Sequence, residues 1–101
     1  MRTRAVHPAL LFLRSIPRGR VVTYAALAWK FRTSPRAIGS IMRANRHPET
    51  YPCYKVVASD GSLTGYSGRG GIAQKRRLLR ADGVRFVADG RVLPECFWNP
   101  R

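Results

Sequence analysis

Residues 23–45, TYAALAWKFRTSPRAIGSIMRAN, predict two short helices that are separated by a tight turn. Thr23 and Ser34 can each accept a hydrogen bond from the first turn of a helix, and Pro35 has the fixed φ that suits a first helical position. Apolar residues recur at helical spacing in both halves. Asn45 ends the second helix, because asparagine tolerates the left-handed conformation that is common there. Two short helices joined in this way are typical of a helix-turn-helix.

The sequence on either side predicts a single domain, residues 1–101, that is mostly α-helical with short β elements. A chain of this length can bury one modest core. The expected elements are a helix over 7–16, a strand at Val21 and Val22, a strand at Val56 and Val57, a turn at Asp60 and Gly61, a helix over 73–82 that Gly83 closes, and a hairpin that turns at Asp89 and Gly90.

The ends and the apolar segments of the chain predict an intracellular protein with no membrane partner. No apolar run approaches the roughly 20 residues that cross a bilayer. The start of the chain is basic and then apolar, but it lacks the small-residue cleavage site of a signal peptide.

Positive charge dominates the composition. Nineteen lysines and arginines face five acidic residues, which gives a net charge of +14, and sixteen of the nineteen are arginine. The planar guanidinium offers a fork of donors that fits phosphate oxygens, so this excess favours a nucleic-acid partner. A solubility role and an anionic membrane surface are the alternatives, and no basic amphipathic stretch is long enough to favour the membrane.

The two cysteines, Cys53 and Cys96, predict neither a zinc site nor a disulfide. They form no C-x-x-C pair, and only two histidines are present. Two interpretations of Cys53 stay open at this point. A free cysteine is often a small buried apolar residue. Lys55 lies two residues away in YPCYKVV, however, and a nearby cation favours the thiolate, which is the attacking species.

Five motifs in order give the sequence a resemblance to a known family. VVTYAALA, RAIGSIMRAN, PCYKVV, GSLTGYSG and AQKRRLLRADG together resemble the C-terminal, DNA-binding domain of O6-alkylguanine-DNA alkyltransferases, over about residues 5–93. The resemblance implies a winged helix-turn-helix-like fold. The family string Pro-Cys-His-Arg-Val differs here at two positions, where Tyr54 replaces histidine and Lys55 replaces arginine.

The resemblance implies a set of catalytic residues. Cys53 matches the alkyl acceptor, and Asn45 matches the side chain that braces the reactive loop. Tyr54 and Asp82 stand where the family has the histidine and the glutamate of a water-bridged proton relay. We expect Tyr54, oriented by Asp82, to take over that relay.

The resemblance also implies DNA and substrate contacts. Arg36 matches the side chain that fills the gap left by a flipped base, and Tyr24 matches the residue that crowds the 3′ phosphate of the target. Gly39 permits a close approach to the minor groove. The remaining expected contacts are Ser59 and Lys55 with DNA, and Tyr66 and Ser67 with the alkylated base.

The function that follows from the resemblance is single-turnover repair of O6-alkylguanine in double-stranded DNA. The protein is expected to act as a monomer without metal or cofactor, in the cytoplasm with the nucleoid or in a eukaryotic nucleus. The alternative is an alkyltransferase-like protein that binds the lesion without chemistry and flags it for other repair. A plain structural DNA-binding protein would require the five ordered motifs to be coincidence.

Overall fold

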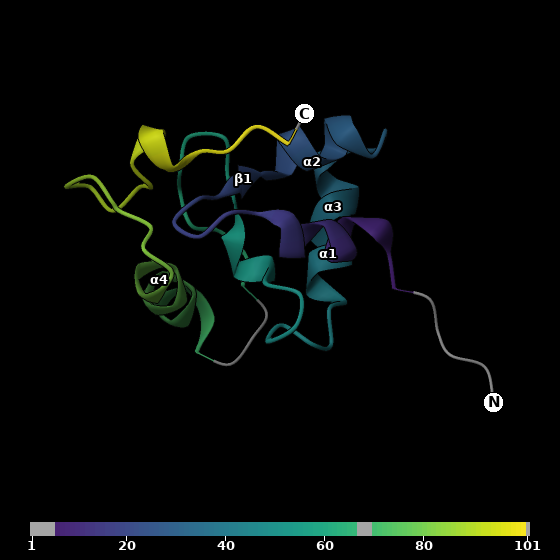
Figure 1. Cartoon of the computed structure of the whole chain (residues 1–101), viewed down its shortest axis with the longest axis horizontal. Helices are drawn as coiled ribbons and strands as arrows, with labels where there is room; N and C mark the ends of the chain where they lie inside the picture. The colour runs from purple at the N-terminus through teal and green to yellow at the C-terminus, as the bar shows by residue number, and fades with distance from the viewer. Residues whose placement is uncertain (1–5, 67–69, 101) are drawn as a thin grey trace.

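The structure, a computed structural model, describes residues 6–66 and 70–100 of the chain (Figure 1). It is mostly helical with short strands, as the sequence predicts. In chain order the elements are α1 (Pro8–Phe12), the 3-10 helix η1 (Leu13–Ser15), β1 (Val22–Thr23), α2 (Tyr24–Lys30), α3 (Pro35–Arg43), η2 (Cys53–Lys55), β2 (Val56–Val57), α4 (Gly71–Ala81) and η3 (Pro94–Cys96). None of the described helices is long and apolar enough to cross a membrane.

Helices α2 and α3 form the expected helix-turn-helix, and both predicted caps are present. The Thr23 hydroxyl accepts a hydrogen bond from the Ala26 amide, and the Ser34 hydroxyl accepts one from the Ala37 amide, each at 3.0 Å. These bonds satisfy amides that have no partner inside the helix. Leu27 and Ala28 of α2 are buried. Ile38 and Met42 of α3 are also buried, so the two apolar faces meet.

The predicted left-handed conformation of Asn45 is wrong. Helix α3 ends at Arg43, the capping residue Ala44 keeps a right-handed helical φ, and the described non-glycine residue with positive φ is Arg32, at 55°. The Asn45 side chain instead makes hydrogen bonds with the loop that follows, because its amide donates to the Tyr51 carbonyl at 2.8 Å and its oxygen accepts from the His47 amide at 3.0 Å. The side chain thereby links α3 to the following loop.

Strands β1 and β2 form a parallel pair that connects two distant parts of the sequence. Val22 lies opposite Val56, and Thr23 lies opposite Val57. Val56 and Val57 are fully buried, which suits a strand that is covered on both faces. Because the pair is parallel, α2 starts beside the residues that follow β2, and the turn that carries Cys53 lies at the other end of this short pair.

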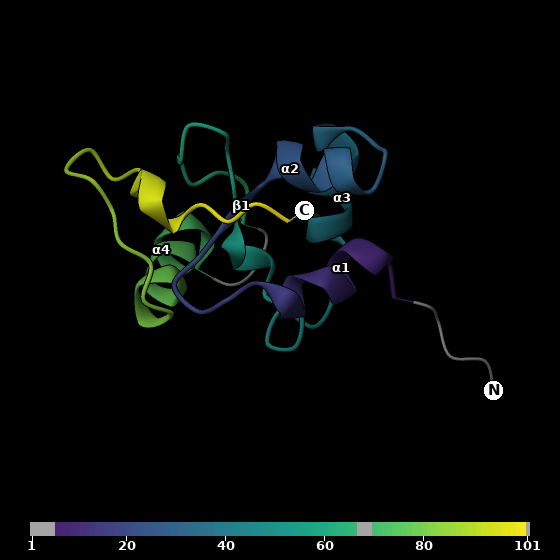
Figure 2. The same ribbon diagram turned by 45° about the horizontal axis from the view of Figure 1, so that its top comes forward.

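The apolar core has two parts. One lies between α1, α2, α3 and η2, and it contains Cys53. The other lies between β2, α4 and the segment over 84–97, and it contains Cys96. Figures 1 and 2 show α4 at one end of the molecule and the α2–α3 pair at the other end. The turn η2, which carries Cys53, lies between them, so both ends contribute to its surroundings.

Candidate active site and nucleic-acid interface

Cys53 begins η2, and hydrogen bonds on its N-terminal side hold it in place. Its backbone amide donates to the Tyr51 carbonyl at 2.7 Å, and the same carbonyl accepts the Asn45 side-chain amide at 2.8 Å. The cysteine is 9% exposed, so solvent reaches only a small part of it. Asn45, at the end of α3, therefore holds the loop that presents the thiol.

Lys75 interacts electrostatically with Cys53, and the sequence analysis missed it. Its ammonium is fully buried and donates to the Val56 carbonyl at 2.7 Å and to the Thr64 carbonyl at 2.9 Å. Burial lowers the pKa of Lys75 to about 8, and attraction to the Cys53 thiolate acts in the opposite direction. The sequence contains a signal for this burial: Lys75 lies four positions before the apolar Leu79, so the two side chains share one face of the helix.

Tyrosine hydroxyls surround the same turn. Burial raises the pKa of Tyr66, and the negative charge of Cys53 raises it further. Burial also raises the pKa of Tyr24, whose hydroxyl donates to the Thr64 carbonyl at 3.4 Å. Both phenols are therefore neutral hydrogen-bond donors at neutral pH. Lys75 lies 5.8 Å from the centre of the Tyr24 ring, so cation and phenol belong to one cluster.

Lys55, which was expected to contact DNA, is buried in this structure. The residue is 3% exposed, and its ammonium forms an ion pair with Asp82 at 2.8 Å. It also donates to the Pro17 carbonyl at 2.9 Å and to the Ile16 carbonyl at 3.4 Å. A charge with so little access to solvent needs partners inside the protein. The Lys55 side chain therefore holds η2 against the segment that follows η1 and cannot reach a phosphate in this structure.

Asp82, which was expected to orient Tyr54, has other partners in this structure. Its carboxylate accepts from Lys55 and from the Gly19 amide, the latter at 2.9 Å. In the described parts of the chain no hydrogen bond joins it to Tyr54. Burial raises the pKa of Tyr54, and the charge of Asp82 raises it further. The phenol keeps its proton at neutral pH, which leaves Tyr54 a donor rather than a base.

An open cleft brings together the other residues expected to contact DNA. Its volume is about 680 Å³, and it lies between the helix-turn-helix and the loop over 58–65. A Cβ added at Gly39 would meet Arg43 at 3.8 Å, an ordinary contact, so packing inside the protein does not require a glycine there. The lining includes Tyr24, Arg36, Gly39 and Ser59, together with Arg43, which the sequence analysis missed.

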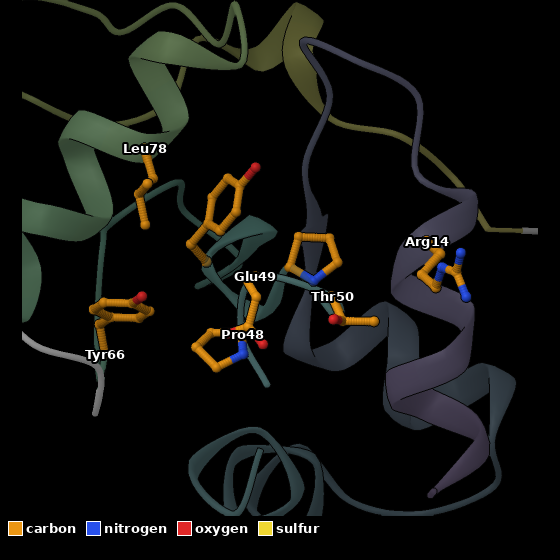
Figure 3. A pocket seen from close by; sticks show the side chains of 8 residues that line it. Arg14, Pro48, Glu49, Thr50, Tyr66 and Leu78 are labelled. Atoms are coloured by element: carbon orange, nitrogen blue, oxygen red, sulfur yellow. The ribbon is translucent and has the colours of Figure 1, made fainter. Parts of the chain in front are cut away.

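A second cavity, of about 600 Å³, opens beside the reactive turn (Figure 3). Pro52 and Tyr54, the two neighbours of Cys53, line it with Tyr66. Figure 3 shows Leu78 near Tyr66 and Arg14 on the opposite side. The predicted pocket residue Ser67 lies outside the described residues. In the described ranges, no group of three or more histidine, cysteine or acidic side chains could bind a metal ion.

A helix-turn-helix, an arginine-lined cleft and a cysteine on a braced turn define a nucleic-acid-binding domain with a candidate nucleophile. The chain belongs to the family of 6-O-methylguanine DNA methyltransferases, and residues 5–84 match the DNA binding domain of that family. It is 47% identical over 75 residues to the methylated-DNA–protein-cysteine methyltransferase of Pyrobaculum aerophilum, which covers 74% of this chain and 49% of the relative.

Two solved structures have the same fold. The O6-methylguanine-DNA methyltransferase of Pyrococcus kodakaraensis matches with a TM-score of 0.69 and 40% identity, over 78% of this chain and 48% of that one. The ATL protein of S. pombe in complex with DNA matches with a TM-score of 0.70 and 26% identity, over 89% of this chain and 90% of that one. The chain thus spans about half the length of the methyltransferases and nearly all of the ATL protein.

Proposed function

We propose that this protein repairs O6-alkylguanine in double-stranded DNA by transferring the alkyl group irreversibly to Cys53. It acts as a monomer and needs no cofactor. The cleft between the helix-turn-helix and the loop over 58–65 holds the duplex, and the flipped base enters the cavity beside the reactive turn. Arg36 enters the space that the base leaves, and its guanidinium hydrogen-bonds the unpaired partner base.

The proposal rests on one structural observation: a buried cysteine is joined by a short parallel ladder to the helix that lines the DNA cleft. Cys53 begins η2, which leads into β2, and β2 pairs in register with β1. Strand β1 leads into α2, where Tyr24 lies in the cleft. Tyr24 also packs against the part of the core that contains Cys53, so a base turned out of a duplex in the cleft has a short distance to travel to the thiol.

In the proposed reaction the Cys53 sulfur, as thiolate, attacks the alkyl carbon that is bound to O6. The S–C bond forms while the C–O6 bond breaks, and the electron pair of that bond goes to the guanine, which takes up a proton. The ammonium of Lys75 stabilises the thiolate, and the neutral phenols of Tyr24 and Tyr66 donate hydrogen bonds toward the leaving base. The product is a stable thioether, so each molecule acts once.

Intact mass spectrometry after incubation with a duplex that contains O6-methylguanine tests the proposal. We expect the protein to replace one hydrogen with one methyl group, with the modification on the peptide that contains Cys53. Cys96→Ser is the matched control, because Cys96 is equally buried but lies in the second part of the core. Cys96→Ser should be methylated and Cys53→Ser should not. A wild-type protein of unchanged mass would rule out transfer.

A second candidate function is recognition of the lesion without chemistry. It is favoured by the absence, in the described parts of the chain, of a hydrogen bond between Tyr54 and Asp82, and by the use of Asp82 as the partner of Lys55. No described side chain then acts as a base for the thiol through that relay. Tight binding of the damaged duplex without any gain in mass would establish this function in place of transfer.

A further inference from the structure

Six arginines lie on α4 or in the segments next to its C-terminal end, and we call them the α4 arginine face. Arg76 and Arg80 both lie against the Phe86 ring, at 4.9 and 5.6 Å from its centre. The turn over 17–20 packs against the end of the same helix, because Arg18 donates to the Ala81 carbonyl at 3.3 Å. The face consists of Arg18, Arg20, Arg76, Arg77, Arg80 and Arg85.

Carboxylates do not neutralise this face. The ion pairs between described residues are His47–Glu49, Lys55–Asp82 and Arg91–Asp89, and none includes an arginine of the face. Asp82 is the acidic residue nearest to it in sequence, and its charge is taken by the buried Lys55. The face therefore presents six formal positive charges to solvent or to a partner.

Structural roles explain only part of the face. Arg18 caps the C-terminal end of α4, where a cation is favourable, and Arg76 donates to the Gly90 carbonyl at 2.8 Å. Arg20, Arg77 and Arg85 are exposed, and in the described ranges their side chains have no hydrogen bond or ion pair. Three guanidinium groups without an acidic partner at one end of a small domain repel one another, and this repulsion disfavours folding. An anionic partner bound there would remove the repulsion.

The α4 arginine face lies away from the DNA cleft. Figures 1 and 2 both show α4 at the end of the molecule opposite α2 and α3, which line that cleft. Arg36 and Arg43 provide the charge of the cleft itself, so the face is not needed for the first contact with DNA.

We propose that the α4 arginine face binds the phosphate backbone of a second DNA segment, so that one molecule bridges two duplexes. Guanidinium forks bind phosphate oxygens with two parallel hydrogen bonds, and release of counterions adds to the affinity. Duplex DNA is favoured over an acidic protein because a family member that is already bound to DNA meets phosphate at a high local concentration. The bridge would hold undamaged DNA beside the lesion.

Energy transfer between two short labelled duplexes tests the bridge. One duplex contains O6-methylguanine and carries the donor, and the other is undamaged and carries the acceptor. The test variant is Arg20→Glu, Arg77→Glu and Arg85→Glu together, which alters only exposed side chains without described contacts. The matched control reverses three exposed charges at the other end, Lys30, Arg32 and Arg46. Both variants have the same net charge, and methylation of Cys53 is measured in parallel.

We expect energy transfer with the wild-type protein at low salt. The test variant should bind the second duplex at least tenfold more weakly, since one phosphate contact contributes roughly eightfold at about 0.1 M salt. Its rate of Cys53 methylation at saturating lesion duplex should stay within about threefold of wild type. The control should show the opposite pattern, with weaker binding of the lesion duplex and, once that duplex is saturating, unchanged binding of the second.

Three results would overturn the bridge. The test variant could give undiminished energy transfer, or the wild-type protein could bind the lesion duplex and give none at any ratio of protein to DNA. A polyglutamate peptide could also displace the second duplex at a lower concentration of negative charge than unlabelled duplex does. That result would identify an acidic protein as the partner instead. All three are measured by binding, so they are independent of whether Cys53 accepts an alkyl group.

Discussion

Replacing Asp82 with asparagine should destabilise the protein by about 3–5 kcal/mol, the usual effect of removing one partner from a buried ion pair. The two charged atoms lie 2.8 Å apart, and the side chains are only 4% exposed for Lys55 and 16% for Asp82. Asp82→Asn leaves the Lys55 ammonium with the Pro17 and Ile16 carbonyls as its described partners. Lys55→Met should cost less, because the remaining Asp82 carboxylate lies nearer to solvent.

The cost is large compared with the stability that a domain of this size has. A stability of about 5–15 kcal/mol is typical of small domains, and each kcal/mol lost lowers Tm by roughly 4–8 °C. Asp82→Asn should therefore lower Tm by at least about 12 °C and shift the urea midpoint without changing the m-value. Equilibrium urea unfolding followed by circular dichroism measures both variants.

The chain contains a matched control for this experiment. The pair Arg91–Asp89 has the same 2.8 Å separation, but its side chains are 49% and 54% exposed. Asp89→Asn should cost far less than Asp82→Asn, since water screens an exposed pair. The double variant Lys55→Met, Asp82→Leu should recover most of the stability, because apolar residues of similar size often replace a buried pair without loss. Equal, small effects of Asp82→Asn and Asp89→Asn would refute the reasoning.

Three further predictions concern the proposed reaction. Lys75 loses its proton above its pKa of about 8, so the rate of methyl transfer at saturating duplex should fall on the alkaline side of that pH. Lys75→Met should react slowly, and its rate should show no such fall. A wild-type rate that still rises at higher pH would contradict the role. Arg36→Ala should weaken binding of a lesion duplex by at least about tenfold, because flipping the base costs a few kcal/mol. Binding of undamaged duplex should fall little. Equal losses for the two duplexes in a fluorescence titration would assign Arg36 to phosphate contact alone. Asn45→Ala removes the hydrogen bond to the Tyr51 carbonyl, which contributes about 1 kcal/mol. The variant should transfer the methyl group more slowly in quench-flow kinetics, with unchanged DNA affinity by anisotropy. If the affinity falls and the rate stays constant, Asn45 acts only through α3.

The helices of this domain could be predicted because their signals are local in sequence. Thr23 and Ser34 each cap the helix that follows within three residues, and Pro35 fits a first turn in any context. The short strands and the turn at Asp60 and Gly61 also follow from neighbouring residues. The order of five motifs predicted the fold and the family.

Only the tertiary structure decided the partners of the buried charges. Lys55 was expected to contact DNA, yet its ammonium is paired with Asp82 from the far end of α4. Lys75 drew no prediction from the sequence, yet it is fully buried and interacts electrostatically with Cys53. Caps and turns depend on hydrogen bonds between residues a few positions apart. The environment of a charge depends instead on desolvation and on neighbours that the fold brings together across long stretches of sequence.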